Sequence, residues 1–195
     1  MADPVRKVRP AGASPELERT TIGELDRFAK SGRLFAVLDA CDASAVPEMA
    51  RELGERRAVS LYRGTADEMY WAIAPYLFAV DTRILAWIKE TLWDEPWGIF
   101  VIADEKLETL RRHFRRFLVV RAPNGEQWYF RYYDPRVLRT FLNACSADEL
   151  DEIFGPVQAF GIPAVGANDV TLVSRERPSR RIRLRVRAPV GADGG

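Results

Sequence analysis

Side chains that commonly perform catalysis or bind metal ions are few and scattered in this sequence. The chain has one histidine, His113, and two cysteines, Cys41 and Cys145, which match no metal-ligand spacing. A single histidine excludes a histidine-rich zinc site and leaves a serine or cysteine nucleophile only one possible base. His113 lies among arginines near the end of an expected helix, where a positive field lowers the pKa of the imidazole and weakens it as a base. We therefore expect His113 to be a surface or helix-capping residue.

Other motifs for catalysis or cofactor binding are missing as well. The sequence contains neither the glycine fingerprint of dinucleotide-binding folds nor a P-loop. Asp148 and Asp151 share a helix face, but most such pairs are solvated surface, and nothing marks this one as a glycosidase-type dyad. We therefore expect a protein that is not an enzyme and that uses no cofactor and no metal. An enzyme with carboxylates around a cleft stays open as an alternative, and it would show carboxyl pKa values driven apart by their surroundings.

Composition and charge are typical of a soluble globular protein. Of the 195 residues, 47% are hydrophobic and 29% are charged, and the net charge is +1. So small a net charge argues against bulk electrostatic attraction to nucleic acid or membrane. No apolar run reaches the roughly 18 residues needed to span a bilayer, residues 1–13 lack the apolar core of a signal peptide, and two distant cysteines suit a reducing compartment. We expect a cytoplasmic protein without a membrane partner.

The pattern of apolar residues predicts a single α/β domain. Short apolar runs indicate strands, and apolar residues at helical spacing indicate helices that begin at capping residues. The sheet is expected to be mixed, with βα units in the N-terminal half and an antiparallel hairpin and strands in the C-terminal half. We expect a mobile segment at 1–15, the domain at 16–173, and a basic strand with a flexible tail at 174–195. Strands are expected at 34–38, 58–62, 76–80 and 97–102, and helices near 44–54, 67–74, 81–92, 104–117, 134–142 and 146–155.

A hairpin is expected around Asn124-Gly125, because this dipeptide between two apolar runs is the strongest short-range hairpin signal. A two-residue turn pairs Val119 with Phe130 and places Val120 opposite Tyr129. Both faces of such a hairpin are largely apolar. We therefore expect it to be covered on both sides, inside the sheet.

The segment Tyr133-Asp134-Pro135-Arg136 combines a helix start with a positive charge in the first turn, where the helix dipole disfavours it. Asp134 at the N-cap followed by Pro135 is a helix-start signature. Arg136 puts a cation in the first turn, where it opposes the helix dipole by a few tenths of a kcal/mol up to about 1 kcal/mol. An internal carboxylate or a carboxylate of a partner must offset that cost. Tyr133 and Arg136 are therefore candidate partner-binding residues.

Two tryptophans lie on either side of a short polar stretch. Trp93 and Trp97 flank Asp94-Glu95-Pro96, an expected loop. We expect one of the two to be exposed, and an exposed aromatic residue in a loop is a good candidate for a binding hot spot. The other tryptophans are assigned to the core.

The last charged segment alternates arginine with apolar residues, which places its arginines on one face of a strand. One interpretation is an edge strand protected by charge against aggregation. The other is a surface that binds an acidic partner protein. Nucleic acid is the less favoured partner, since no aromatic residues interleave with the arginines. The residues concerned are Arg181, Arg183, Arg185 and Arg187.

Five motifs occur in one order at natural spacings between residues 33 and 156: Ala74-Pro75-Tyr76-Leu77, Trp97-Gly98-Ile99-Phe100, Leu110–Arg121, Phe130–Leu138 and Phe154-Gly155-Pro156. In these motifs the chain resembles the domain of unknown function found in bacterial type VI secretion effector chaperones, also called adaptors. The resemblance implies a non-catalytic cytoplasmic protein. Its expected partners are a toxic effector and the valine-glycine-repeat (VgrG) spike protein onto which the effector is loaded.

One difference from the larger members of that family concerns the C-terminus. They carry an extended region beyond the shared block, whereas residues 157–195 alone follow it here. If cargo choice depends on that region, this chain has little room for it. The alternative function is a nucleic-acid-binding protein that uses the C-terminal arginines, with an affinity that falls steeply as salt rises.

Overall fold

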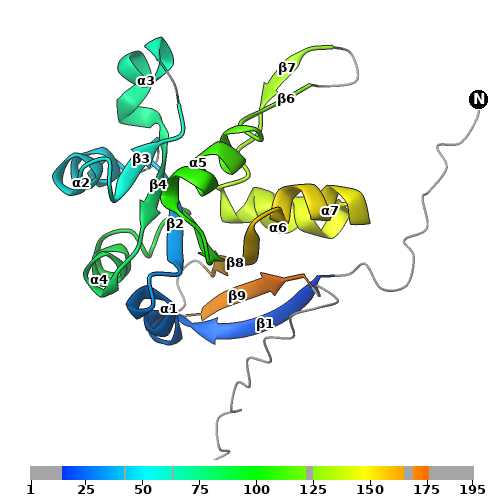
Figure 1. Ribbon diagram of the computed structural model, residues 1–195, viewed down its shortest axis with the longest axis horizontal. Coiled ribbons are helices and arrows are strands. Elements are labelled where there is room, and N and C mark those ends of the chain that lie inside the picture. Colours follow the sequence, from blue (N-terminus) through cyan, green and yellow to red (C-terminus); the bar gives the residue numbers. More distant parts are fainter. Residues whose placement is uncertain (1–14, 42, 63, 122–124, 165–168, 176–195) are drawn as a thin grey trace, which may run out of the picture.

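The computed structural model describes residues 15–41, 43–62, 64–121, 125–164 and 169–175. Its centre is a seven-stranded sheet with the strand order β1-β9-β8-β5-β2-β4-β3 (Figure 1). The strands are β1 (Glu16–Thr21), β2 (Leu34–Asp39), β3 (Ala58–Ser60), β4 (Pro75–Ala79), β5 (Gly98–Ala103), β8 (Val157–Pro163) and β9 (Asp169–Ser174). The expected α/β class is confirmed.

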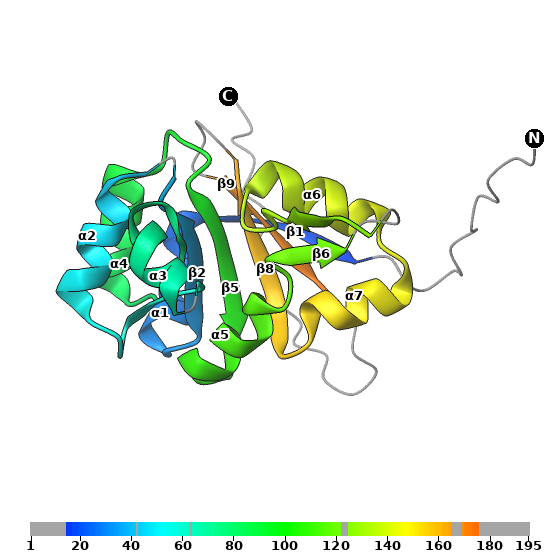
Figure 2. The ribbon, with the colours of Figure 1, turned by 90° about the horizontal axis from the view of Figure 1, so that it is seen from above.

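Helices cover both faces of this sheet, so the fold has three layers (Figure 2). One face carries α1 (Asp26–Lys30), α2 (Ala45–Leu53) and α4 (Thr82–Thr91). The other carries α5 (Leu107–Arg115), α6 (Pro135–Ala144) and α7 (Ala147–Phe154). Every residue of β2 and β5 is buried, as expected for strands covered on both sides. The short elements α3 (Thr65–Tyr70) and η2 (Trp71–Ile73) follow β3.

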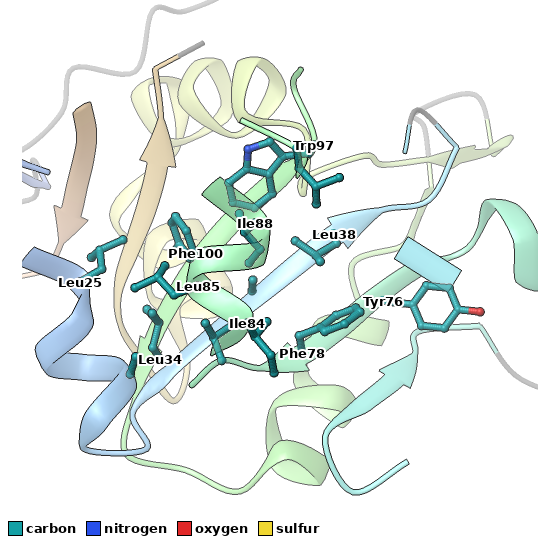
Figure 3. Packing of buried hydrophobic residues seen from close by; sticks show 14 of the residues in the cluster. Leu25, Leu34, Leu38, Tyr76, Phe78, Ile84, Leu85, Ile88, Trp97 and Phe100 are labelled. Carbon is teal, nitrogen blue, oxygen red and sulfur yellow. The ribbon is translucent and has the colours of Figure 1, made fainter. Parts of the chain in front are cut away.

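The core under α4 contains side chains from one face of the strands and from one side of the helix. Successive strand side chains point to opposite faces, so Leu38 and Phe100 face the helices of this layer (Figure 3). Ile84 and Ile88 project onto them from one side of α4. Burial of one such side chain contributes about 1.5–3 kcal/mol. This packing, rather than helix propensity, therefore holds α4 on the sheet.

No parallel pair occurs among the strand pairings that the structure describes. Strands β2 and β3 run in the same direction around α2, and so do β4 and β5 around α4. In each case an antiparallel strand lies between the two, β4 in the first and β2 in the second. The expected βα units are present, but they join strands that are not neighbours. The expected mixture of parallel and antiparallel pairs is therefore not found.

Most helix ends lie where the sequence places them. The Asp81 carboxylate accepts the Ile84 N–H at 2.9 Å at the start of α4, and Ser146 with Glu149 forms the capping box of α7. Ser44 precedes α2, but its side chain makes no capping hydrogen bond. Strand β1 and helix α1 lie in a stretch to which the sequence pattern assigned no element. Residues 176–195, with the expected basic strand, lie outside the described part of the chain.

The expected hairpin forms, but its position and register differ from the prediction. Strands β6 (Val119–Arg121) and β7 (Gln127–Tyr129) make a separate two-stranded sheet, which we call the ribbon. Val119 pairs with Tyr129 rather than with Phe130, because the connection is longer than the two residues of the Asn-Gly turn. After β7 the chain turns into the core, where Tyr132 is fully buried. The prediction of a hairpin inside the main sheet was wrong. The two strands pair at only three residues each, and the ribbon projects from the body of the protein.

Candidate protein-docking site

Exposed apolar side chains gather on two elements at one end of the sheet. Apart from Leu17, the exposed large hydrophobic residues of the described chain all belong to α3–η2 or to the ribbon. In Figure 1 both elements extend beyond the β3–β4 side of the sheet, α3 beside α2 and the ribbon beyond α5. Exposed apolar side chains that gather on a few elements are candidates for contacts with another protein. We call these residues the apolar docking face: Met69, Tyr70, Trp71, Ile73, Val119, Val120, Trp128 and Tyr129.

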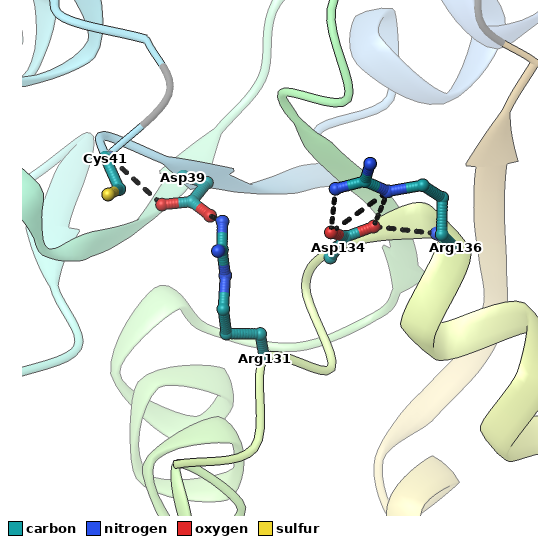
Figure 4. A network of polar contacts seen from close by, with 5 residues as sticks. All are labelled: Asp39, Cys41, Arg131, Asp134 and Arg136. Carbon is teal, nitrogen blue, oxygen red and sulfur yellow. Dashed lines mark hydrogen bonds and ion pairs between the residues drawn. The ribbon is translucent and has the colours of Figure 1, made fainter.

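An ion pair joins the base of the ribbon to the sheet. Asp39 ends β2, and its carboxylate is buried, with 1% of the side chain exposed. Its Oδ1 accepts the backbone N–H of Cys41 at 3.0 Å, and its Oδ2 pairs with the guanidinium of Arg131 (Figure 4). Arg131 lies two residues after β7 and stays 41% exposed. The ribbon is therefore fixed at its base, while its strands extend into solvent.

A second contact ties the ribbon to the end of β3. The rings of Tyr62 and Tyr129 meet edge to face, with centroids 6.4 Å apart. The guanidinium of Arg115 on α5 donates to the Tyr62 carbonyl at 2.6 Å. Tyr129 nevertheless remains 69% exposed and Trp128 55% exposed. The Tyr129 ring is thus held against Tyr62, and both rings remain available to a partner.

The other half of the docking face is also held from below. The Arg51 guanidinium lies 3.4 Å from the ring centroid of Trp71, a cation–π contact that orients the indole. The hydroxyl of Tyr76 donates to the Trp71 carbonyl at 2.8 Å. Tyr76 belongs to β4, so η2 is fixed directly to the sheet.

Positive charge lies beside the ribbon. The last turn of α5 carries Arg112 and Arg115, and Arg116 follows as its C-cap three residues before β6. Arg116 contacts His113, whereas Arg112 makes no hydrogen bond or ion pair with any residue that the structure describes. Cations at a helix C-terminus are favoured by the helix dipole. They also give this end of the docking face a preference for acidic groups.

His113 is buried between α5 and the end of α7, so the expectation of a surface residue was wrong and the capping alternative is confirmed. The Ile153 carbonyl lies 2.8 Å from Nε2 and can only accept, so Nε2 carries the proton. Nδ1 then accepts from Nη2 of Arg116 at 3.0 Å. Burial lowers the pKa of His113, and the charge of Arg116 lowers it further, against the opposing effect of the Ile153 carbonyl. The neutral imidazole therefore acts as a structural bridge.

The prediction that Trp93 or Trp97 is exposed was wrong. Their rings pack 6.0 Å apart, and the Trp97 ring lies 5.1 Å from that of Phe100. Trp97 is 1% exposed and Trp93 is 8% exposed. The loop between them turns back on itself, with the Trp97 N–H donating to the Glu95 carbonyl at 2.8 Å, so both indoles enter the core. Neither can act as a surface hot spot in this structure.

Arg136 pairs with an internal carboxylate, the first of the two alternatives. Its Nε lies 3.0 Å from Oδ1 of Asp134 and its Nη2 lies 2.6 Å from Oδ2 (Figure 4). Asp134 also caps α6 by accepting the backbone N–H of Arg136 at 2.8 Å. Burial alone would raise the pKa of Asp134, but these hydrogen bonds and the arginine charge outweigh it and lower the pKa.

Tyr133, the remaining described candidate, is buried against Tyr132. Burial, together with the nearby charge of Asp39, raises the pKa of its hydroxyl. It therefore lies beneath the surface and is not exposed to a partner. Arg181, Arg183, Arg185 and Arg187 lie outside the described residues.

The described residues contain no cluster of three or more His, Cys, Asp or Glu side chains that could hold a metal ion. Within the same residues no helix is long and apolar enough to cross a membrane. A cavity of about 570 Å³ lies at the opposite edge of the sheet from β3, between β1, β8, β9 and α6. Arg19 and Arg139 line it together with Glu18 and Asp169, so its charges balance.

The sequence did not single out the residues of the docking face. The sequence pattern predicts Trp128 in the core with most other tryptophans and Tyr129 in a covered hairpin, and both predictions were wrong. The sequence did contain a signal for exposure. Residues 124–127 are glycine or polar, so the end of the hairpin has no apolar side chains to bury.

The chain has no significant match among curated proteins or among solved structures. Residues 34–152, more than half of the chain, match the profile of the domain of unknown function DUF4123. The matched region runs from the start of β2 into α7 and contains all of the docking face as well as Asp39, Arg131 and Asp134. The chain therefore belongs to the DUF4123 family.

Proposed function

We propose that this protein is a non-catalytic adaptor that binds a toxic effector of a type VI secretion system in the cytoplasm and assists its loading onto a VgrG-type spike protein. The apolar docking face is the observation that carries this proposal. Membership of the DUF4123 family and the five motifs that resemble effector chaperones support it. Tyr62 also holds the ring of Tyr129 in place without covering it.

The chemistry of the docking face suits protein recognition. Tryptophan and tyrosine are enriched among binding hot spots, and truncation of a hot-spot residue weakens binding by about 2 kcal/mol or more. Trp128 and Tyr129 are the largest exposed aromatic surfaces on the ribbon. The arginines at the end of α5, which leads into the ribbon, favour a partner with acidic groups.

Co-purification from the native host tests the proposal. The tagged chain is expected to recover an effector and a spike component, identified by mass spectrometry. The double variant Trp128→Ala/Tyr129→Ala is expected to recover at least tenfold less effector at equal expression. Leu17→Ala is the matched control, since Leu17 is also exposed but lies on β1 at the far edge of the sheet.

Two results would count against the proposal. One is recovery of neither an effector nor a spike component by the wild-type chain. The other is equal recovery of effector by the double variant and by Leu17→Ala, which would place the binding surface elsewhere.

A further inference from the structure

We infer that the ribbon binds an extended segment of the partner as an additional β-strand, along the free edge of β7. This inference deepens the proposed function and rests on it for the identity of the partner as an effector. The segment it fits alternates apolar side chains with polar ones, acidic ones among them.

The hydrogen-bond register of the ribbon shows which backbone groups are available. Phe130 N–H donates to the Leu118 carbonyl at 2.9 Å, so these two residues form a hydrogen-bonded pair. In an antiparallel ladder such pairs alternate with non-hydrogen-bonded ones. Val120 and Trp128 therefore bond across the ribbon, whereas the backbone groups of Gln127 and Tyr129 point away from β6. They lie on the outer edge of β7, which pairs with no other strand of the described sheets.

This edge lacks the features that normally prevent strand addition. Edge strands are usually protected by charged residues, proline or a covering element. Strand β7 consists of Gln127, Trp128 and Tyr129, all exposed and none charged. The edge of β7 is therefore open to an incoming strand.

The side chains of the ribbon match the alternation of a strand. Val119 and Tyr129 lie on one face, and Val120 and Trp128 lie on the other, and all four are exposed. A third strand places its apolar side chains beside one of these faces and its polar and acidic side chains beside the other. The arginines at the end of α5, which precedes β6 in the chain, give this part of the surface a positive charge that favours a strand with acidic positions. A two-stranded ribbon is marginally stable by itself, so a third strand also stabilises it.

The test uses a fluorescein-labelled peptide, Thr-Val-Glu-Val-Thr-Val-Glu-Val-Thr, and the same peptide N-methylated on every amide. The protein is expected to bind the first at least tenfold more tightly, since both carry the same side chains and only the first has N–H groups that can pair with β7. Gln127→Pro removes one outward N–H and is expected to weaken binding of the first peptide at least tenfold. Gln127→Ala, which keeps that N–H, is expected to bind within twofold of wild type. Equal binding of the two peptides, or by the two variants, would overturn the inference.

Hydrogen exchange provides a measurement that does not depend on a proline variant. The backbone amide of Tyr129 is expected to exchange rapidly in the free protein and at least tenfold more slowly with the unmethylated peptide bound. An unchanged rate in the complex would exclude strand addition on this edge.

The same pair of variants separates this inference from the proposed function in the native host. If effector is recovered with Gln127→Ala and lost with Gln127→Pro, the effector itself uses the edge. If effector is recovered equally with both, the adaptor function is supported and strand addition by the effector is rejected. If the wild-type chain recovers no effector, the proposed function is rejected, and the peptide measurements still test strand addition.

Discussion

The guanidinium of Arg131 forms an ion pair with the buried carboxylate of Asp39 and so joins the base of the ribbon to the end of β2. The backbone of the same region is tied as well, because the Asp39 N–H donates to the Trp97 carbonyl at 2.8 Å. The ribbon therefore projects from a rigid base, although its strands are short. A rigid base lowers the entropy cost of presenting Trp128 and Tyr129 to a partner.

Replacement of Arg131 by alanine is expected to lower the free energy of unfolding by about 1–3 kcal/mol, because the buried Asp39 carboxylate loses a charged partner. The cost stays below that of a fully buried pair, since Arg131 is 41% exposed. Arg83→Ala is the matched control. It breaks a pair with Glu52 whose side chains are 69% and 58% exposed, and it should cost less than about 1 kcal/mol. Urea unfolding of both variants measures the difference, and equal costs would contradict the structural role of the Arg131–Asp39 pair.

The two members of the Asp134–Arg136 pair are expected to differ in their effect on stability. Asp134→Ala removes the N-cap of α6 together with the ion pair and should cost about 1–2 kcal/mol. Arg136→Ala leaves the cap intact, and its side chain is 66% exposed, so it should cost less than about 1 kcal/mol. Thermal unfolding followed by circular dichroism tests the order. A larger loss for Arg136→Ala would mean that the arginine, and not the cap, holds this end of α6.

Stability is expected to depend on pH through His113. Burial lowers its pKa in the folded protein below the value of about 6.5 in the unfolded chain. The unfolded state therefore binds the proton first as the pH falls, so this contribution to stability is complete above about pH 6.5. It is lost as the pH falls from there through the folded pKa, by about 1.4 kcal/mol for each unit of the difference.

His113→Gln is the control for this pH effect, because an amide can still donate to the Ile153 carbonyl but does not titrate. Urea midpoints of the wild type should fall between pH 7 and pH 5 more steeply than those of the variant. Parallel curves would show that His113 does not contribute to the loss of stability in this range.

The sequence predicted correctly those elements that depend only on residues close together in the chain. The caps at Asp81, Asp134 and Ser146 act within three residues of their own position, so they are readable without the fold. The continuous apolar runs of β2 and β5 likewise indicate strands covered on both faces. The internal partner of Arg136 lies two residues away, which is why the sequence could include it among the alternatives.

Exposure could not be predicted in the same way, as Trp97 and Trp128 show. Both tryptophans lie near polar residues, and both gain free energy if they are buried. Trp97 enters the core because its loop turns back toward Phe100, whereas Trp128 lies on a ribbon with no neighbouring layer to pack on. Apolar character indicates which side chains gain from burial, but not whether the fold provides a surface to bury them. Strand order has the same limit, because contacts between distant segments decide it.

The ribbon is expected to open locally far more often than the central sheet. Each of its strands pairs over only three residues, and no third strand supports them within the described structure. Val101, in contrast, lies in β5 between two strands and is fully buried. Hydrogen exchange of the free protein should therefore show the Val120 amide exchanging about 100-fold or more faster than that of Val101, as expected for a region with few buried contacts. Comparable protection of the two amides would mean that the ribbon is held along its whole length. In that case a partner would bind a preformed surface, and the third strand would add no stability to the ribbon.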